Sequence, residues 1–167
     1  HPGVGVAILA KAPLAGFAKT RLIPHLGAEG AASLQRWPLQ RTVRTALSAG
    51  IGPVTLWCAP DTTHHDFAMC RAFGPLALCR QPDGDLGDRM LAALAETTTP
   101  AGTLVIGTDC PALTPALLRL AANTLAGHDA VVVPAEDGGY VLIGMRQAAP
   151  RVFDAVDWST GHVMAQT

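Results

Sequence analysis

The stretch Val4-Gly5-Val6-Ala7-Ile8-Leu9-Ala10 is a continuous apolar run, typical of a strand buried on both faces. A loop with glycine and proline follows it, from Lys11 to Leu26. Apolar runs of similar length recur along the chain and alternate with segments of helical pattern. The expected strands are 4–10, 53–59, 76–80, 103–106, 131–133 and 140–145, and the expected helices are 28–49 (broken or kinked at Pro38), 61–72, 87–97 and one that begins at Pro115.

This alternation predicts an α/β fold. Strands separated by helices of about 10–20 residues form a mostly parallel, Rossmann-like sheet, with helices covering both of its faces in three layers. The 167 residues suit a single domain over 1–167. In open α/β sheets ligands bind at the carboxyl ends of the strands. The loops expected to carry the site are therefore 11–21, 81–89, 107–110 and 135–140.

Charge and composition exclude several classes of protein. Twelve basic and thirteen acidic residues give a net charge of −1, which argues against nucleic-acid or membrane-surface binding. No apolar run reaches the roughly 18 residues of a membrane span. Four cysteines without paired spacing indicate buried thiols in a reducing cytoplasm. Because the chain starts at His1 and ends in what looks like a new helix, we expect residues to be missing at both ends.

The first candidate site is the basic loop after the first expected strand. Both lysines of the chain lie in it, with an arginine two residues beyond the second. Cationic side chains neutralise phosphate oxygens, and arginine can do so through two hydrogen bonds at once. The loop is not a Walker A sequence, because Ala18 stands where glycine belongs. A solvated basic loop is the alternative. The predicted phosphate-binding residues are Lys11, Gly16, Lys19, Thr20 and Arg21.

An aspartate follows another buried run in Gly107-Thr108-Asp109-Cys110-Pro111. A carboxylate at the end of a strand can hold Mg²⁺ or Mn²⁺ while a diphosphate fills other coordination positions. The alternative is that Asp109 only caps the next helix or turn. Thr114 is the better cap for a helix that begins at Pro115, which leaves Asp109 available.

Two carboxylates and two glycines occur together in Pro134-Ala135-Glu136-Asp137-Gly138-Gly139-Tyr140. The glycines allow a tight turn and close approach of the backbone to a ligand. Asp137 is a candidate second metal ligand or general base, and Glu136 points elsewhere if the backbone is extended. A polar hairpin turn is the alternative.

The segment from Gln81 to Met90 is a weaker signal. Its glycine amides, including that of Gly84, and the Gln81 side chain are suited to reading a nucleobase edge. Arg89 is placed to reach a phosphate or to pair with Asp85. An ordinary loop followed by a helix start is equally compatible with this segment. The pair His64-His65 resembles a metal site but is better explained as surface, and Trp158-Ser159 is either a helix start or an acceptor contact.

These motifs together resemble a family of bacterial GT-A-type glycosyltransferase-like proteins, the radical-SAM/selenodomain-associated transferase 1 family, which is similar to 2-phospho-L-lactate guanylyltransferase. The resemblance covers nearly the whole chain. The segments that carry it are Lys11-Ala12-Pro13, Gly16-x-x-Lys19-Thr20-Arg21-Leu22, Gly84-Asp85-Leu86-Gly87-x-Arg89-Met90, Gly107-Thr108-Asp109-Cys110-Pro111, Pro134-Ala135-Glu136-Asp137-Gly138-Gly139-Tyr140 and Trp158-Ser159-Thr160.

The resemblance implies a nucleotide-diphospho-sugar transferase fold. It also implies that Asp109 is the metal-holding aspartate and that Lys11, Lys19 and Arg21 lie near the phosphates. Two departures matter. Thr108-Asp109 offers one carboxylate where a D-x-D motif offers two, and relatives of this family continue for some tens of residues past Thr160, so we expect a C-terminal truncation.

Three functions are compatible with these residues. The first is a glycosyltransferase that uses a nucleotide sugar and Mg²⁺ or Mn²⁺, with Lys19 neutralising charge and Asp137 orienting or deprotonating a small-molecule acceptor. The second is a nucleotidylyltransferase that moves a nucleotide from a nucleoside triphosphate to a phosphorylated small molecule. The third is a nucleotide-binding domain without catalysis. The expected acceptor contacts are Glu136, Gly138, Gly139, Tyr140, Trp158 and Ser159.

Overall fold

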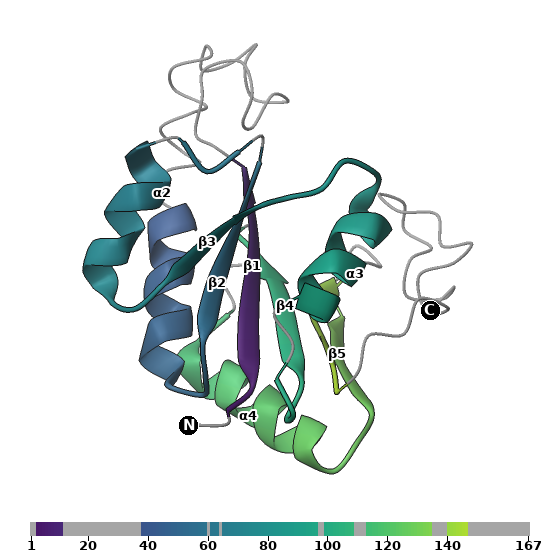
Figure 1. Ribbon diagram of the computed structural model, residues 1–167. Helices are drawn as coiled ribbons and strands as arrows, with labels where there is room; N and C mark the ends of the chain where they lie inside the picture. Colours follow the sequence, from purple (N-terminus) through teal and green to yellow (C-terminus); the bar gives the residue numbers. More distant parts are fainter. Residues whose placement is uncertain are drawn as a thin grey trace, which may run out of the picture.

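The computed structural model describes residues 3–11, 38–59, 61–63, 65–96, 99–108, 113–134 and 140–146. These residues form a six-stranded sheet in the order β3-β2-β1-β4-β6-β5, with helices packed against it (Figure 1). Residues 38–49 form an unlabelled helix between β1 and β2. The labelled elements are β1 (Gly5–Lys11), β2 (Val54–Ala59), α2 (His65–Met69), the 3-10 helix η2 (Cys70–Phe73), β3 (Ala77–Arg80), α3 (Leu86–Glu96), β4 (Thr103–Gly107), α4 (Pro115–Ala126), β5 (Ala130–Pro134) and β6 (Tyr140–Met145).

The sheet is mostly parallel, as expected. β1 pairs in parallel with β2 on one side and with β4 on the other, and β3 extends the parallel set beyond β2. β6 is antiparallel to both β4 and β5. Because β5 runs opposite to β6, it points in the same direction as β4. Five of the six strands therefore end at the same edge of the sheet.

Helices cover both faces of the sheet, which confirms the three-layer α/β prediction. Alternate residues of a strand point to opposite faces. Val6 and Ile8 of β1 belong to a buried cluster that also includes side chains of helix 38–49, α2 and α4. Ala7 of β1 lies in a second cluster with Trp57 of β2 and with Met90, Ala93 and Leu94 of α3.

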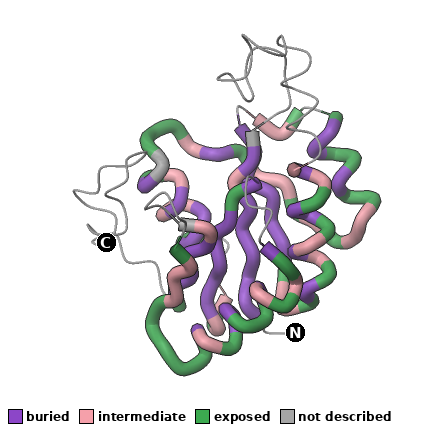
Figure 2. The backbone as a smooth tube through the Cα atoms, turned by 180° about the vertical axis from the view of Figure 1, so that it is seen from behind, coloured by how far each residue is buried: buried purple, intermediate pink, exposed green. Residues whose placement is uncertain are grey.

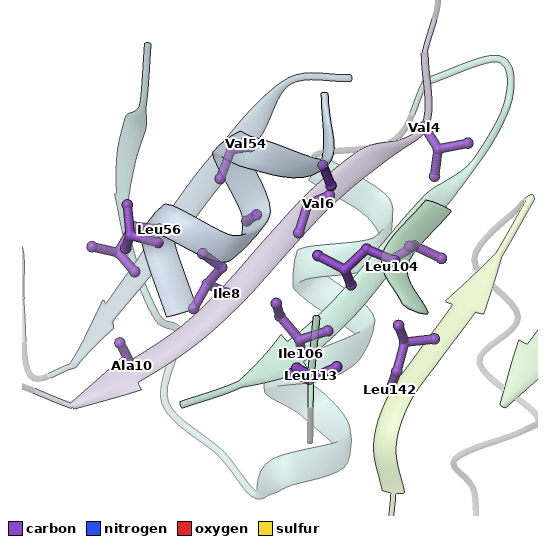
Figure 3. Packing of buried hydrophobic residues seen from close by; sticks show 14 of the residues in the cluster. Val4, Val6, Ile8, Ala10, Val54, Leu56, Leu104, Ile106, Leu113 and Leu142 are labelled. Atoms are coloured by element: carbon purple, nitrogen blue, oxygen red, sulfur yellow. The ribbon is translucent and has the colours of Figure 1, made fainter. Parts of the chain in front are cut away.

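The larger cluster lies on the face covered by helix 38–49, α2 and α4. Figure 2 shows the central strands as buried, and Figure 3 shows how β1, β2, β4 and β6 contribute to this cluster. Ile8, Leu56 and Leu104 are completely buried within it. Burial of a side chain of this size stabilises the folded chain by about 1.5–3 kcal/mol, so the continuous apolar runs account for much of the sheet's stability.

The helices differ in part from expectation. Thr114 caps α4, since its side chain accepts a hydrogen bond from the Leu117 amide at 3.1 Å. Asp61 is not a helix cap: its carboxylate accepts bonds from the amide and hydroxyl of Thr63, and α2 begins only at His65. Residues 28–37 of the expected first helix lie outside the described residues. In the described part of the chain, no helix is long and apolar enough to cross a membrane.

Candidate functional site

The four predicted site segments meet the sheet at one edge. β1 ends there at Lys11, where segment 11–21 begins, and β4 ends at Gly107, where segment 107–110 begins. β3 ends at Arg80, directly before segment 81–89. The fourth segment connects β5 to β6, and the register of β4 with β6 pairs Ile106 with Leu142 near the same edge. The topology therefore brings together the strand ends next to segments that are far apart in the sequence.

Gln81 links three strands at this edge. Its backbone amide donates to the carbonyl of Cys58 at 2.8 Å. Its side-chain Nε2 donates to the carbonyls of Ala10 at 3.0 Å and of Trp57 at 2.9 Å. Because both acceptors are carbonyl oxygens, the amide nitrogen and not the oxygen must face them, which determines the orientation of the side chain. Both N–H groups are thus engaged by backbone, and only Oε1 remains for the predicted contact with a base.

A reciprocal pair of aspartates starts α3. The amide of Asp88 donates to Oδ1 of Asp85 at 2.8 Å, and the amide of Asp85 donates to Oδ2 of Asp88 at 3.1 Å. This is a capping box, in which the first and fourth residues satisfy each other's backbone N–H groups. The spacing Asp85-x-x-Asp88 is the sequence signal that would have revealed it. The two carboxylates place negative charge at the helix N-terminus and occupy the amides of Asp85 and Asp88.

Gly84 adopts a conformation that the capping box requires. Its φ is +125°, a region that residues with a side chain rarely adopt, and a Cβ atom there would overlap Oδ2 of Asp88. We expect Gly84→Ala to destabilise the fold by about 1–3 kcal/mol, because it strains the backbone and displaces the Asp88 carboxylate. Urea unfolding measures this loss. Gly127→Ala is the matched control, because its φ is −108° and a Cβ there meets nothing within 4 Å. An equal loss in both variants would contradict the explanation.

Two buried donor nitrogens lie in α3 and in the part of β2 that packs against it. Nε of Arg89 and Nε1 of Trp57 have no hydrogen-bond partner among the described residues. The side chain of Trp57 lies in the α3-facing cluster and is only 2% exposed. Within the described part of the chain Arg89 makes no ion pair with Asp85, whose Oδ1 accepts the Asp88 amide instead. Trp57 is not among the site residues that the sequence predicts, because a tryptophan in an apolar strand carries no local signal of an unsatisfied donor.

Most of the predicted site residues lie outside the part of the chain that the structure describes. The structure places the backbone of Lys11 at the end of β1, the backbone of Tyr140 at the start of β6, and Gln81, Gly84 and Arg89 as given above. Because Thr114 caps α4, Asp109 is not needed for that role. The predicted residues outside the described ranges are Gly16, Lys19, Thr20, Arg21, Asp109, Glu136, Asp137, Gly138, Gly139, Trp158 and Ser159.

The described residues do not by themselves form a metal site. They contain no group of three or more histidine, cysteine, aspartate or glutamate side chains that is suited to holding an ion. His65 is instead within 3.0 Å of the buried carboxylate of Asp66. Aspartate oxygens are suitable donors for Mg²⁺ or Mn²⁺. The metal assignment thus depends on Asp109 and Asp137, both outside the described ranges.

The cysteines within the described ranges are free thiols, and two of them are buried. Burial raises the pKa of Cys58 to about 12 and that of Cys70 to about 11. Burial also raises the pKa of Cys79, which lies beside Trp57 in the sheet register. A raised pKa keeps a thiol protonated and poorly nucleophilic, which fits a structural role for the buried Cys58 and Cys70. This confirms the expected buried thiols for Cys58 and Cys70.

Solved structures share this architecture. A protein from Desulfovibrio desulfuricans G20, described as a "putative nucleotide-diphospho-sugar transferase", is 28% identical, with a TM-score of 0.81 over 98% of this chain and 72% of that one. A 4-diphosphocytidyl-2C-methyl-D-erythritol synthase from Anaerococcus prevotii DSM 20548 is 14% identical, with a TM-score of 0.52 over 92% of this chain and 76% of that one, and shows likeness of fold alone. No curated protein matches the chain.

The chain shares the fold of the Desulfovibrio protein, so the expected nucleotide-diphospho-sugar transferase architecture is confirmed. A family model also matches residues 42–160, which cover most of the chain and include the strands β2 to β6. The chain therefore belongs to the DUF2064 family, described as an uncharacterized protein conserved in bacteria.

Proposed function

We propose that this chain is a transferase that takes a nucleotide sugar as donor and binds it at the carboxyl edge of the sheet. The observation that carries the proposal is that β1, β3, β4 and β5 end at this edge, each at or directly before the start of one of the four predicted site segments. The similarity to the Desulfovibrio protein supports a nucleotide-sugar donor, because 28% identity extends over 98% of this chain.

The proposed roles follow from charge and position. Lys11 and the segment from Gly16 to Arg21, which includes Lys19 and Thr20, neutralise the diphosphate. Asp109 and Asp137 hold Mg²⁺ or Mn²⁺, which when bound stabilises the negative charge of the departing nucleoside diphosphate. Asp137 also orients or deprotonates the acceptor hydroxyl.

The acceptor, a small molecule, lies against the β5–β6 connection in this proposal. Two glycines there leave room for the backbone to approach it closely. The residues assigned to it are Glu136, Gly138, Gly139, Tyr140, Trp158 and Ser159.

Nucleotidyl transfer is the second candidate. The observation that favours it is that both lysines of the chain lie within residues 11–21, a segment that begins with the last residue of β1. Such a density of positive charge suits a triphosphate as well as a diphosphate. In that reaction a substrate phosphate attacks the α-phosphate of a nucleoside triphosphate, and pyrophosphate leaves.

A thermal-unfolding panel tests the choice of donor. UDP-glucose, GDP-mannose, ADP-glucose and dTDP-glucose are compared with the matching nucleoside triphosphates, each with Mg²⁺, Mn²⁺ or a chelator. A ligand at about 100 times its Kd stabilises the folded chain by about 2.7 kcal/mol, which raises the Tm by roughly 5–10 °C for a chain of this size. We expect one nucleotide sugar to give the largest shift and to need the metal.

The products then separate the two reactions. Glycosyl transfer or hydrolysis releases a nucleoside diphosphate from the nucleotide sugar, whereas nucleotidyl transfer releases pyrophosphate from the triphosphate. A larger shift with one triphosphate, followed by pyrophosphate release, would replace the first function with the second. If no nucleotide raises the Tm under any metal condition, both candidates are wrong.

A further inference from the structure

The side chain of Gln81 does more than occupy the loop after β3. It is only 7% exposed, although it is polar and lies at the edge where the candidate site is formed. Its Nε2 bridges Ala10 of β1 and Trp57 of β2, whose strands pair Leu9 with Trp57 and Ala10 with Cys58. Nε2 of Gln81, the residue directly after β3, therefore connects the backbones of β1 and β2.

The end of β1 needs such a support. β1 pairs with β2 as far as Lys11, but its register with β4 ends at the pair of Leu9 with Gly107. Among the described residues, Ala10 and Lys11 thus have a strand neighbour on one side only. The bond from Gln81 holds the carbonyl of Ala10, the residue directly before Lys11.

We propose that Gln81 is a positioning residue for the nucleotide: its side-chain amide holds the carbonyls of Ala10 and Trp57 and thereby fixes the backbone of Lys11. This inference rests on the proposed function, in which Lys11 contacts the phosphates. A displacement of about 1 Å at a binding group is enough to reduce rates about 100-fold, so a support at the strand end matters for function. Gln81 acts here through the backbone and needs no contact with the nucleotide.

Gln81→Met tests the inference, because methionine has a similar length and cannot donate a hydrogen bond. The matched control is Thr99→Val, which removes a hydroxyl that donates to the Gly3 carbonyl at 2.6 Å at the opposite edge of the sheet. Both variants lose side-chain bonds to backbone carbonyls, so both are expected to lower the Tm by about 2–6 °C.

Only Gln81→Met should affect the site. We expect hydrogen exchange at the amides of Ala10 and Lys11 to rise about tenfold or more, while exchange at Val105 and Ile106 changes only as in Thr99→Val. We also expect the Kd for UDP, GDP, ADP, CDP or dTDP with Mn²⁺ to rise about tenfold, measured with whichever of these diphosphates the wild-type chain binds.

The outcomes separate this inference from the proposed function. If Gln81→Met lowers the Tm as Thr99→Val does and leaves exchange at Lys11 or the Kd unchanged, Gln81 is only structural and the inference is wrong. If the wild-type chain binds none of the five diphosphates, the proposed function fails, and the nucleotide role of Gln81 fails with it. The first failure appears only in the variant, and the second appears already in the wild type.

Discussion

Asp109→Asn is expected to remove the metal-dependent part of nucleotide binding, with a rise in Kd of about 100-fold, or roughly 2.7 kcal/mol, in the presence of Mn²⁺. Asparagine keeps the shape of aspartate and loses the charge, so it is a poor ligand for a hard divalent ion. Asp109 follows Thr108 directly after β4. Calorimetric titration with the nucleotide that gives the largest thermal shift measures the effect.

The control for Asp109→Asn must also remove one aspartate charge near the carboxyl ends of the strands. Asp83→Asn does so, because Asp83 lies in the loop between β3 and α3 and its side chain is 99% exposed. We expect Asp83→Asn to change the Kd less than about twofold, as an exposed charge is screened by salt. Binding in a chelator should be equal in both variants. An unchanged Kd for Asp109→Asn in Mn²⁺, or an equal rise in both variants, contradicts the metal assignment.

Leu104→Ala is expected to cause the largest loss of stability, about 2–5 kcal/mol. Leu104, the second residue of β4, is completely buried in the cluster shown in Figure 3. Its removal loses apolar burial and leaves a cavity. Urea unfolding followed by circular dichroism measures the loss. Leu120→Ala on α4 is the matched control, because Leu120 is 62% exposed, and it should change stability by less than about 0.5 kcal/mol.

The position opposite Leu104 allows a sharper test. Gly144 of β6 pairs with Leu104, and a Cβ there would lie 2.5 Å from Cδ2 of Leu104 and 2.9 Å from Cγ1 of Val131. Gly144→Ala alone should cost about 1–3 kcal/mol through overpacking. In Leu104→Ala/Gly144→Ala the added methyl enters the vacated space. We expect the double variant to lose about 1–2 kcal/mol less than the two single losses combined, and strict additivity would contradict this packing.

Local signals predicted the elements whose causes are local. The continuous apolar run from Val4 to Ala10 predicted β1, because such a run is typical of a strand buried on both faces, and both faces of β1 are buried. Thr114 and Pro115 start α4 because a hydroxyl acceptor and a residue without an N–H satisfy the first turn without distant partners. The prediction that Asp61 caps a helix was wrong, because its carboxylate accepts hydrogen bonds from Thr63, before α2 begins at His65.

Contacts between residues that are far apart in the chain could not be predicted from the sequence. Gln81 bonds to Ala10, which lies 71 positions earlier in the chain, and no pattern near either residue announces that bond. The apolar runs of β5 and β6 also look alike in the sequence. The structure places β6 beside β4, with Leu142 and Ile143 buried on opposite faces. It leaves β5 as the outermost strand on that side of the sheet.

The sequence by itself therefore determined that strands and helices alternate in an α/β fold, and it predicts which loops carry phosphate- and metal-binding side chains. These properties depend on the period of apolar residues and on the chemistry of short segments. Only the tertiary structure determined the strand order, the direction of β6 and the bonds by which Gln81 holds β1 and β2. Those features depend on which buried surfaces and backbone groups satisfy one another across the sheet, and that choice is made by the whole folded chain.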